Sequence, residues 1–448
     1  MTRFLRLAVA AAFLLGFSSA YAFHDGGVAD CGGCHAVHNA NSAGTIIGAS
    51  NTNLLVSDTV SDTCLQCHAS NDTVGNGYHV LSTTTGSYAA GVAPKERTPG
   101  GDFGWLLKSY SYSVRSAVTN WSPGGHHINA PLFGITNATG MGSDAQAPGG
   151  TFPTSSLGCS SCHDPHSKAR TDSQGNFAPV ASWKIIGSGS YPTLQTGASG
   201  EFNNAYGTYR FLYNQNSYYT GAGYAGPVPA VIAGGQVTWT GQSPLAIVPS
   251  SYNLSESVNQ LRVAYADIPG RTMGLWCAAC HPKMHTNSGL LVHPIDVALS
   301  TKGEDAYYNA YVNSGNKTGV WATAYLSLVP IATGGVGQRS DMNGIAGFGP
   351  TSTGANPTAT VMCLSCHRAH ASGFQNDIRW ENEVEFITYV NASNVAVWPG
   401  SDNQPSASTT QYGRGRPSAE TQAAYYDRNV SVFTAYQRSL CNKCHLQD

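Results

Sequence analysis

Charged side chains are scarce in this chain of 448 residues, at 11% of the total. Lysine and arginine number 23 and aspartate and glutamate number 25, so the formal net charge at pH 7 is only −2. Proteins that bind nucleic acid or acidic membrane surfaces usually carry a marked excess of positive charge. The composition therefore disfavours both kinds of partner. Hydrophobic residues, at 41%, are nevertheless too frequent for a disordered chain.

Long hydrophobic segments are also absent beyond the N-terminus. Residues 1–22 read as a secretory signal peptide, with Arg3 and Arg6 ahead of an apolar stretch and a small-residue cleavage site. The apolar stretch is too short to span a bilayer comfortably. We therefore expect an exported protein with no transmembrane segment in the mature chain. We also expect that mature chain, residues 23–448, to form a single domain.

Cysteine is absent outside one recurring motif. All 12 cysteines lie in six Cys-x-x-Cys-His sequences, so none is left for a disulfide or a free thiol. The pairs are Cys31 and Cys34, Cys64 and Cys67, Cys159 and Cys162, Cys277 and Cys280, Cys363 and Cys366, and Cys441 and Cys444. The histidines that directly follow them are His35, His68, His163, His281, His367 and His445.

This motif is the attachment signature of a c-type haem. The two thiols bond to one edge of the haem, and the histidine becomes an axial ligand of the iron. Zinc ribbons, disulfides and redox dithiols are the alternative interpretations of Cys-x-x-Cys. With 15 histidines in 448 residues, chance would place one after a given pair only about 3% of the time. Six occurrences therefore predict six covalently bound haems c.

The remaining histidines are candidates for the second axial position of each iron. Removing the six motif histidines from 15 leaves nine, which are His24, His38, His79, His126, His127, His166, His285, His293 and His370. Nine candidates exceed six positions, so no iron needs to be left open. Iron with two histidine ligands offers no substrate site, which favours electron transfer over catalysis. We expect the adjacent pair His126 and His127 to supply one ligand.

Three of these candidates have a distinctive position. His38, His166 and His370 each follow a motif histidine by three residues. A side chain that close in sequence cannot reach the opposite face of its own haem, so as a ligand it must serve a different one. This arrangement would clamp neighbouring haems together, with edges roughly 4 Å apart.

The sequence contains 51 glycines and 22 prolines. It lacks the long amphipathic repeats that are typical of a helical bundle. We expect a multihaem cytochrome c fold, mostly ordered coil with short helices and few short strands, wound around a chain of six haems. Local patterns predict a short strand within 103–115 and helices at 257–266, 303–312, 418–426 and from 430 into the last motif. The Gly- and Tyr-rich stretch 200–241 is interpreted as an ordered loop of undetermined role.

The sequence resembles the filament-forming outer-surface hexahaem cytochromes of metal-reducing bacteria. The resemblance includes the mature start at Phe23-His24 with CGGCHAVH behind it, and it continues in order through most of the mature chain. It rests on long blocks as well as on the short motifs. The blocks are 98–115 (TPGGDFGWLLKSYSYSVR), 147–168 (APGGTFPTSSLGCSSCHDPHSK), 363–374 (CLSCHRAHASGF) and 436–448 (YQRSLCNKCHLQD).

The resemblance implies a secreted homopolymer at the outer surface, which carries electrons to mineral acceptors or other cytochromes. It also implies that His38 crosses to the adjacent subunit and ligates the haem held by Cys363, Cys366 and His367. Two other hypotheses remain open. A monomeric periplasmic or cell-surface electron shuttle would take all its ligands from its own chain. A multihaem reductase would keep one five-coordinate, high-spin haem.

Overall fold

Most of the described chain runs outside regular secondary structure. The computed structural model describes residues 31–36, 54–71, 79–136, 145–163, 165, 262–268, 272–287, 290–291, 293–334, 353–403 and 410–445, with a few short pieces between 184 and 247. The expected signal peptide and most of the stretch 200–241 lie outside these ranges. Within them, no helix is long and apolar enough to cross a lipid bilayer.

The helices are short, and the longest α-helix described has 9 residues. The α-helices are α2 (Cys31–Cys34), α3 (Val60–His68), α4 (Met273–Ala278), α5 (Pro282–His285), α6 (Glu304–Ala310), α7 (Cys363–Cys366), α8 (Thr410–Gly413), α9 (Ser418–Ala424) and α10 (Asn442–His445). The 3-10 turns are η1 (Phe103–Leu107), η2 (Pro131–Phe133), η3 (Thr154–Ser156), η4 (Cys159–Ser161), η8 (Leu299–Thr301), η9 (Trp321–Thr323), η11 (Gln375–Asp377) and η13 (Val430–Val432).

The strands are shorter still and form only small sheets. They are β1 (Tyr110–Val114), β2 (Ala117–Trp121), β3 (Lys184–Ile185), β4 (Asn204–Ala205), β5 (Ala246–Ile247), β6 (Ala264–Ala266), β7 (Thr286–Asn287), β8 (Leu290–Leu291), β9 (Ala332–Thr333), β10 (Tyr389–Val390) and β11 (Ala396–Val397). β1 and β2 form an antiparallel hairpin, and β5, β6 and β9 form a three-stranded sheet in that order. The expectation of coil with few short helices and strands is confirmed.

Two of the expected helices are present. α6 lies within 303–312 and begins after Gly303, which adopts a left-handed conformation with φ of 81°. α9 lies within 418–426, but its N-cap is Pro417, and Ser418 is the first helical residue. The hydroxyl of Ser418 donates to Asp402 Oδ2 at 3.0 Å, so it links two segments instead of capping its own helix.

Other local predictions were wrong or incomplete. The helix expected at 257–266 is wrong over its described end, because Ala264–Ala266 is the fully buried middle strand β6. The helix expected from 430 is also wrong, since η13 ends at an extended residue and α10 begins only at Asn442. The strand expected within 103–115 is confirmed for β1, whereas Phe103–Leu107 forms the 3-10 turn η1.

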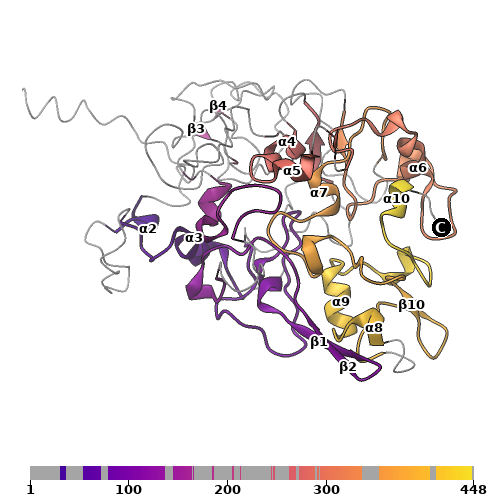
Figure 1. Ribbon diagram of the computed structural model, residues 1–448, viewed down its shortest axis with the longest axis horizontal. Coiled ribbons are helices and arrows are strands. Elements are labelled where there is room, and N and C mark those ends of the chain that lie inside the picture. The colour runs from indigo at the N-terminus through magenta and orange to yellow at the C-terminus, as the bar shows by residue number, and fades with distance from the viewer. Residues whose placement is uncertain are drawn as a thin grey trace, which may run out of the picture.

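Among the described residues, the hydrophobic core forms three clusters that follow the haem motifs. One contains Leu65 and packs against Cys159, the next packs against Cys162 and Cys277, and the largest packs against three later motif cysteines. Each cluster therefore joins motifs that are consecutive in the sequence. Figure 1 shows that α2 lies at one end of the long axis of the molecule, while α6 and α10 lie at the other.

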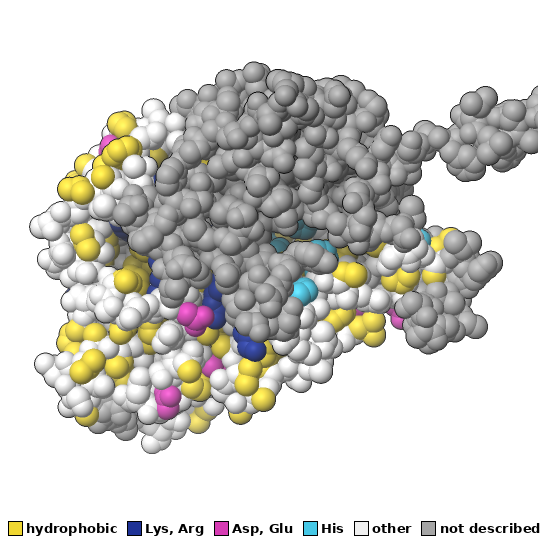
Figure 2. All heavy atoms as spheres, turned by 180° about the vertical axis from the view of Figure 1, so that it is seen from behind, with side chains coloured by type: hydrophobic (Ala, Val, Ile, Leu, Met, Phe, Trp, Pro, Cys, Tyr) yellow, Lys and Arg dark blue, Asp and Glu magenta, His cyan; other side chains and the backbone are white. Residues whose placement is uncertain are grey.

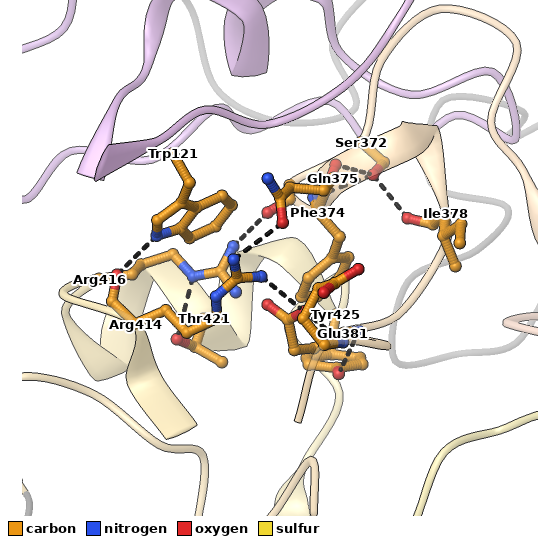
Figure 3. A network of polar contacts seen from close by, with 12 residues as sticks. Trp121, Ser372, Phe374, Gln375, Ile378, Glu381, Arg414, Arg416, Thr421 and Tyr425 are labelled. Atoms are coloured by element: carbon orange, nitrogen blue, oxygen red, sulfur yellow. Dashed lines mark hydrogen bonds and ion pairs between the residues drawn. The ribbon is translucent and has the colours of Figure 1, made fainter. Parts of the chain in front are cut away.

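A buried polar network holds the β1–β2 hairpin against α8 and α9 (Figure 3). Trp121 Nε1 donates to the carbonyl of Arg414 at 2.7 Å, and the Arg414 guanidinium lies 4.6 Å from the centre of the Trp121 ring. Arg416 lies over Phe374 at 4.8 Å and bonds to Thr421 at 3.2 Å. Each of these arginines contacts both an aromatic ring and a hydrogen-bond acceptor. These contacts allow the two charged side chains to occupy buried positions.

We expect Glu381→Ala to lower the free energy of unfolding by about 3 kcal/mol, because it removes the charged partner of a buried cation. Arg414 Nη1 lies 3.1 Å from Glu381 Oε1, and both side chains are at most 6% exposed.

Glu385→Ala is the matched control. It breaks the Arg438–Glu385 pair of the same length, whose side chains are 43% and 57% exposed, and should cost less than about 1 kcal/mol. Guanidinium unfolding followed by circular dichroism measures both. Equal losses from the two variants would contradict this prediction.

Candidate haem sites

Each haem motif forms a single helical turn or the end of a short helix. The two cysteines are three positions apart, so one turn brings them to the same face of the helix. In the motifs that begin at Cys159, Cys277, Cys363 and Cys441, the backbone N–H of the motif histidine donates to the carbonyl of the first cysteine at 3.0 or 3.1 Å. This hydrogen bond closes the turn and fixes the histidine relative to the two thiols.

Consecutive motifs meet at their cysteines. The side chain of Cys64 in the second motif contacts Cys159 in the third. In the same way, Cys277 in the fourth motif contacts Cys363 in the fifth. The chain therefore brings two predicted haem-attachment motifs side by side at each of these junctions.

The other junctions keep the motifs in sequence order. At these junctions the cysteines are near enough to interact electrostatically, which applies to Cys34 and Cys64, to Cys162 and Cys280, and to Cys366 with Cys441 and Cys444. The six motifs therefore form one series through the molecule. In Figure 1 this series starts at α2, passes through α3, α4 and α7, and ends at α10.

Three motif histidines each face one of the candidate second ligands. The ring centres are 6.0 Å apart for His126 and His281, and 6.3 Å apart for the other two pairs, His163 with His370 and His293 with His445. Two metal–nitrogen bonds of roughly 2.0 Å plus the two ring radii give about 6 Å across one iron. The separations of these pairs therefore fit two axial ligands of a haem.

The ring nitrogens of His126 and His281 are oriented for metal binding. Nδ1 of His126 lies 2.8 Å from the carbonyl oxygen of Ala369, and Nδ1 of His281 lies 2.9 Å from that of Pro148. A carbonyl oxygen only accepts, so each Nδ1 carries the proton and leaves the Nε2 lone pair for a metal. Burial and the nearby His281 lower the pKa of His126 to about 4, which keeps the ring neutral, as a ligand must be.

No protein-family model matches the sequence. The chain is 40% identical over 451 residues to the C-type cytochrome OmcS of Geobacter sulfurreducens, and this alignment covers 98% of the chain and 97% of the relative. The chain belongs to the OmcS family of c-type cytochromes. Two solved structures agree with this. The cryo-EM structure of OmcS nanowires from the same organism has a TM-score of 0.76 and 35% identity, over 95% of this chain and 100% of that one. The outer membrane cytochrome S filament has a TM-score of 0.75 and 36% identity, over 96% of this chain and 100% of that one.

In this OmcS-family cytochrome, the His126-His127 doublet has an asymmetric geometry. The ring of His126 faces that of the motif histidine His281. Among the described residues, no ring contact joins His127 to a motif histidine. His127 is buried, and burial lowers its pKa. His126 is therefore the member of the doublet that could hold an iron.

The other candidate iron ligands of the OmcS-family chain are His285, His79, and three histidines that lie outside the described residues. His285 Nε2 lies 3.3 Å from Asp296 Oδ2, so a carboxylate already engages the nitrogen that would bind a metal. His79 lies beside the second motif, because the next residue, Val80, donates from its N–H to the carbonyl of His68 at 2.9 Å. His24, His38 and His166 lie outside the described residues, so their expected roles remain predictions.

The sequence interpretation missed several residues that support the OmcS-family haem motifs. Arg379 Nε donates to the carbonyls of Leu364 and His367 at 2.6 and 3.1 Å, which clamps the fifth motif. No local pattern announces this contact, because it depends on the tertiary fold. Ser161 and Ser365 accept from backbone N–H groups at the starts of their motif helices, at 2.8 and 3.1 Å. Their position before the second cysteine is a signal that could have been found.

Proposed function

We propose that this chain is an extracellular electron-transfer protein that binds six haems c and polymerises head to tail into a filament. Export through the signal peptide 1–22 would bring the mature chain, residues 23–448, across the periplasm to the outer surface. The terminal acceptors are external, such as metal oxides or other cytochromes. The observation that carries the proposal is the unbroken series of six motifs from one end of the molecule to the other.

We assign three irons two histidine ligands each from the opposed imidazole pairs. His281 pairs with His126, His163 with His370, and His445 with His293. The irons on His35, His68 and His367 take their second ligands from among His24, His38, His79 and His166. In this scheme His127 and His285 bind no iron.

The protein provides fixed geometry and closed coordination. Haem c, when bound, supplies reversible one-electron chemistry. The three opposed histidine pairs would each hold an iron from both sides, which would leave no open position for a substrate. The contacts between Cys64 and Cys159 and between Cys277 and Cys363 fix successive attachment points close together. These features suit conduction better than catalysis.

Polymerisation is supported by the two solved OmcS structures, which are a nanowire and a filament. We assign His38 to the iron held by Cys363, Cys366 and His367 in the adjacent copy. No ring contact among the described residues opposes His367 with another histidine, whereas three other motif histidines have one. A ligand from the next copy would complete this site and extend the haem series across the subunit boundary.

Purified wild-type protein should contain six haems per chain, show only low-spin ferric haem in its paramagnetic resonance spectrum, and form fibres in electron micrographs. Iron analysis, spectroscopy and imaging of one sample check these three results. Particles without fibres under all conditions would favour the monomeric shuttle. A five-coordinate, high-spin haem in the assembled protein would favour the multihaem reductase.

A further inference from the structure

Four large hydrophobic side chains are exposed together around α6 and η9. Tyr307, Val312, Val320 and Trp321 are 42%, 44%, 59% and 50% exposed. Single exposed hydrophobic residues are common, but a cluster of large ones usually marks a contact surface. We call these four residues the α6–η9 patch. Figure 2 shows hydrophobic side chains gathered at the corner of the molecule that carries α6.

The patch is built on a fixed backbone. Gly319 N–H donates to the carbonyl of Ala310 at 2.8 Å, which folds the chain back beside the end of α6. A Cβ at Gly319 would lie only 3.2 Å from Val312 Cγ2, so Val312 sits against this returning segment. The carbonyl of Trp321 then accepts from Gly354 N–H at 2.7 Å. These hydrogen bonds fix the backbone that carries the exposed side chains, so the patch is already formed in the single chain.

The inner side of the same region packs on the last haem motif. Lys443, between the two cysteines of that motif, donates from Nζ to the carbonyl of Tyr311 at 2.7 Å and lies 4.5 Å from the centre of the Tyr308 ring. Tyr308 is fully buried, and its hydroxyl donates to the carbonyl of Val329 at 2.8 Å. The α6–η9 patch therefore belongs to the end of the molecule where the motif series finishes.

The opposite end of the molecule also presents an apolar side chain. Leu54 is 44% exposed and has φ of 54°, a left-handed conformation that leucine rarely adopts. It is tied to the first motif, because Ala36 N–H donates to its carbonyl at 2.6 Å and Val56 N–H donates to the carbonyl of Cys34 at 2.9 Å. α2, which carries these cysteines, lies far from α6 along the long axis (Figure 1).

We propose that the α6–η9 patch of one copy packs against the first-motif segment of the next copy, around Leu54. This inference rests on the proposed polymer and names the surfaces that join its subunits. Two different surfaces at opposite ends make a head-to-tail contact, which repeats into an open filament and does not close into a dimer. Four half-exposed side chains cannot supply the roughly 800 Å² per partner of a stable interface. The patch therefore acts together with the cross-chain ligand His38.

The test replaces Val320 by aspartate and Trp321 by serine in the full-length haem-loaded protein. We expect the protein concentration at which filaments form to rise by about tenfold or more, because a tryptophan buried in an interface typically contributes much of the binding energy. Haem content and low-spin signals from the three opposed histidine pairs should stay unchanged. The matched control is Val118→Asp at the tip of the β1–β2 hairpin, where Val118 is 66% exposed. This control should assemble like the wild type.

Photo-crosslinking identifies the occupant of the patch. With p-benzoylphenylalanine at position 321, illuminated filaments should yield dimers crosslinked to residues 31–36 or 54–58 of another copy. Normal assembly of the Val320→Asp, Trp321→Ser variant, or crosslinks to the patch of a second copy or to lipid, would overturn this inference and leave the proposed filament standing. Wild-type protein that remains monomeric would overturn both.

Discussion

Replacing His126 by alanine is expected to convert about one sixth of the haem from low-spin to high-spin, because one iron loses its second histidine. The ring of His126 lies 6.0 Å from that of His281, which is already fixed by its motif. Paramagnetic resonance of the oxidised protein measures the fraction. The total of six covalent haems should be unchanged, since the thioether bonds and the motif histidines remain.

His127→Ala is the matched control and should leave all six haems low-spin. The neighbouring histidine cannot take over in the His126 variant, because hydrogen bonds fix the backbone of this segment. The backbone N–H of Gly124 donates to the carbonyl of Phe374 at 2.7 Å, and the backbone N–H of His126 donates to the carbonyl of His370 at 2.8 Å. Added imidazole should restore the low-spin signal of the His126 variant. A high-spin signal from the His127 variant alone would reverse our assignment of the doublet.

His38→Ala is expected to abolish filaments while keeping six covalent haems in each chain. In our account the iron on His367 receives its second ligand from the neighbouring copy, so the variant should be monomeric with about one sixth of its haem high-spin. Mass photometry, electron microscopy and paramagnetic resonance measure these three properties.

Free imidazole separates the two roles of His38. It should fill the open axial position and restore the low-spin signal, but it cannot bridge two chains, so filaments should stay absent. The His127→Ala protein serves again as the control, since it should assemble normally. Normal filaments from the His38 variant would contradict cross-chain ligation.

The sequence was sufficient to locate the predicted haem motifs because their pattern is local. Two thiols and a histidine within five residues need only one helical turn, and α7 and α10 form such turns. α6 could also be predicted, because Gly303 and the acidic residues of its first turn are local signals for the start of a helix.

The pairing of histidines could not be predicted, because it joins distant parts of the chain. His163 and His370 face each other only after the fold brings the third and fifth motifs together, and counting ligands cannot reveal such a contact. The same reason explains the failure at Ala264–Ala266. Its local pattern suggested a helix, but pairing with β5 and β9 makes it a buried strand. The Arg414–Glu381 contact is equally non-local.

The most direct test of our central claim is a cryo-EM map of the native filament at a resolution that shows side chains. We predict that His38 of one subunit binds the iron attached to Cys363 and Cys366 of the next, opposite His367. The result that would contradict our account is His38 bound to an iron of its own chain or lying away from every iron.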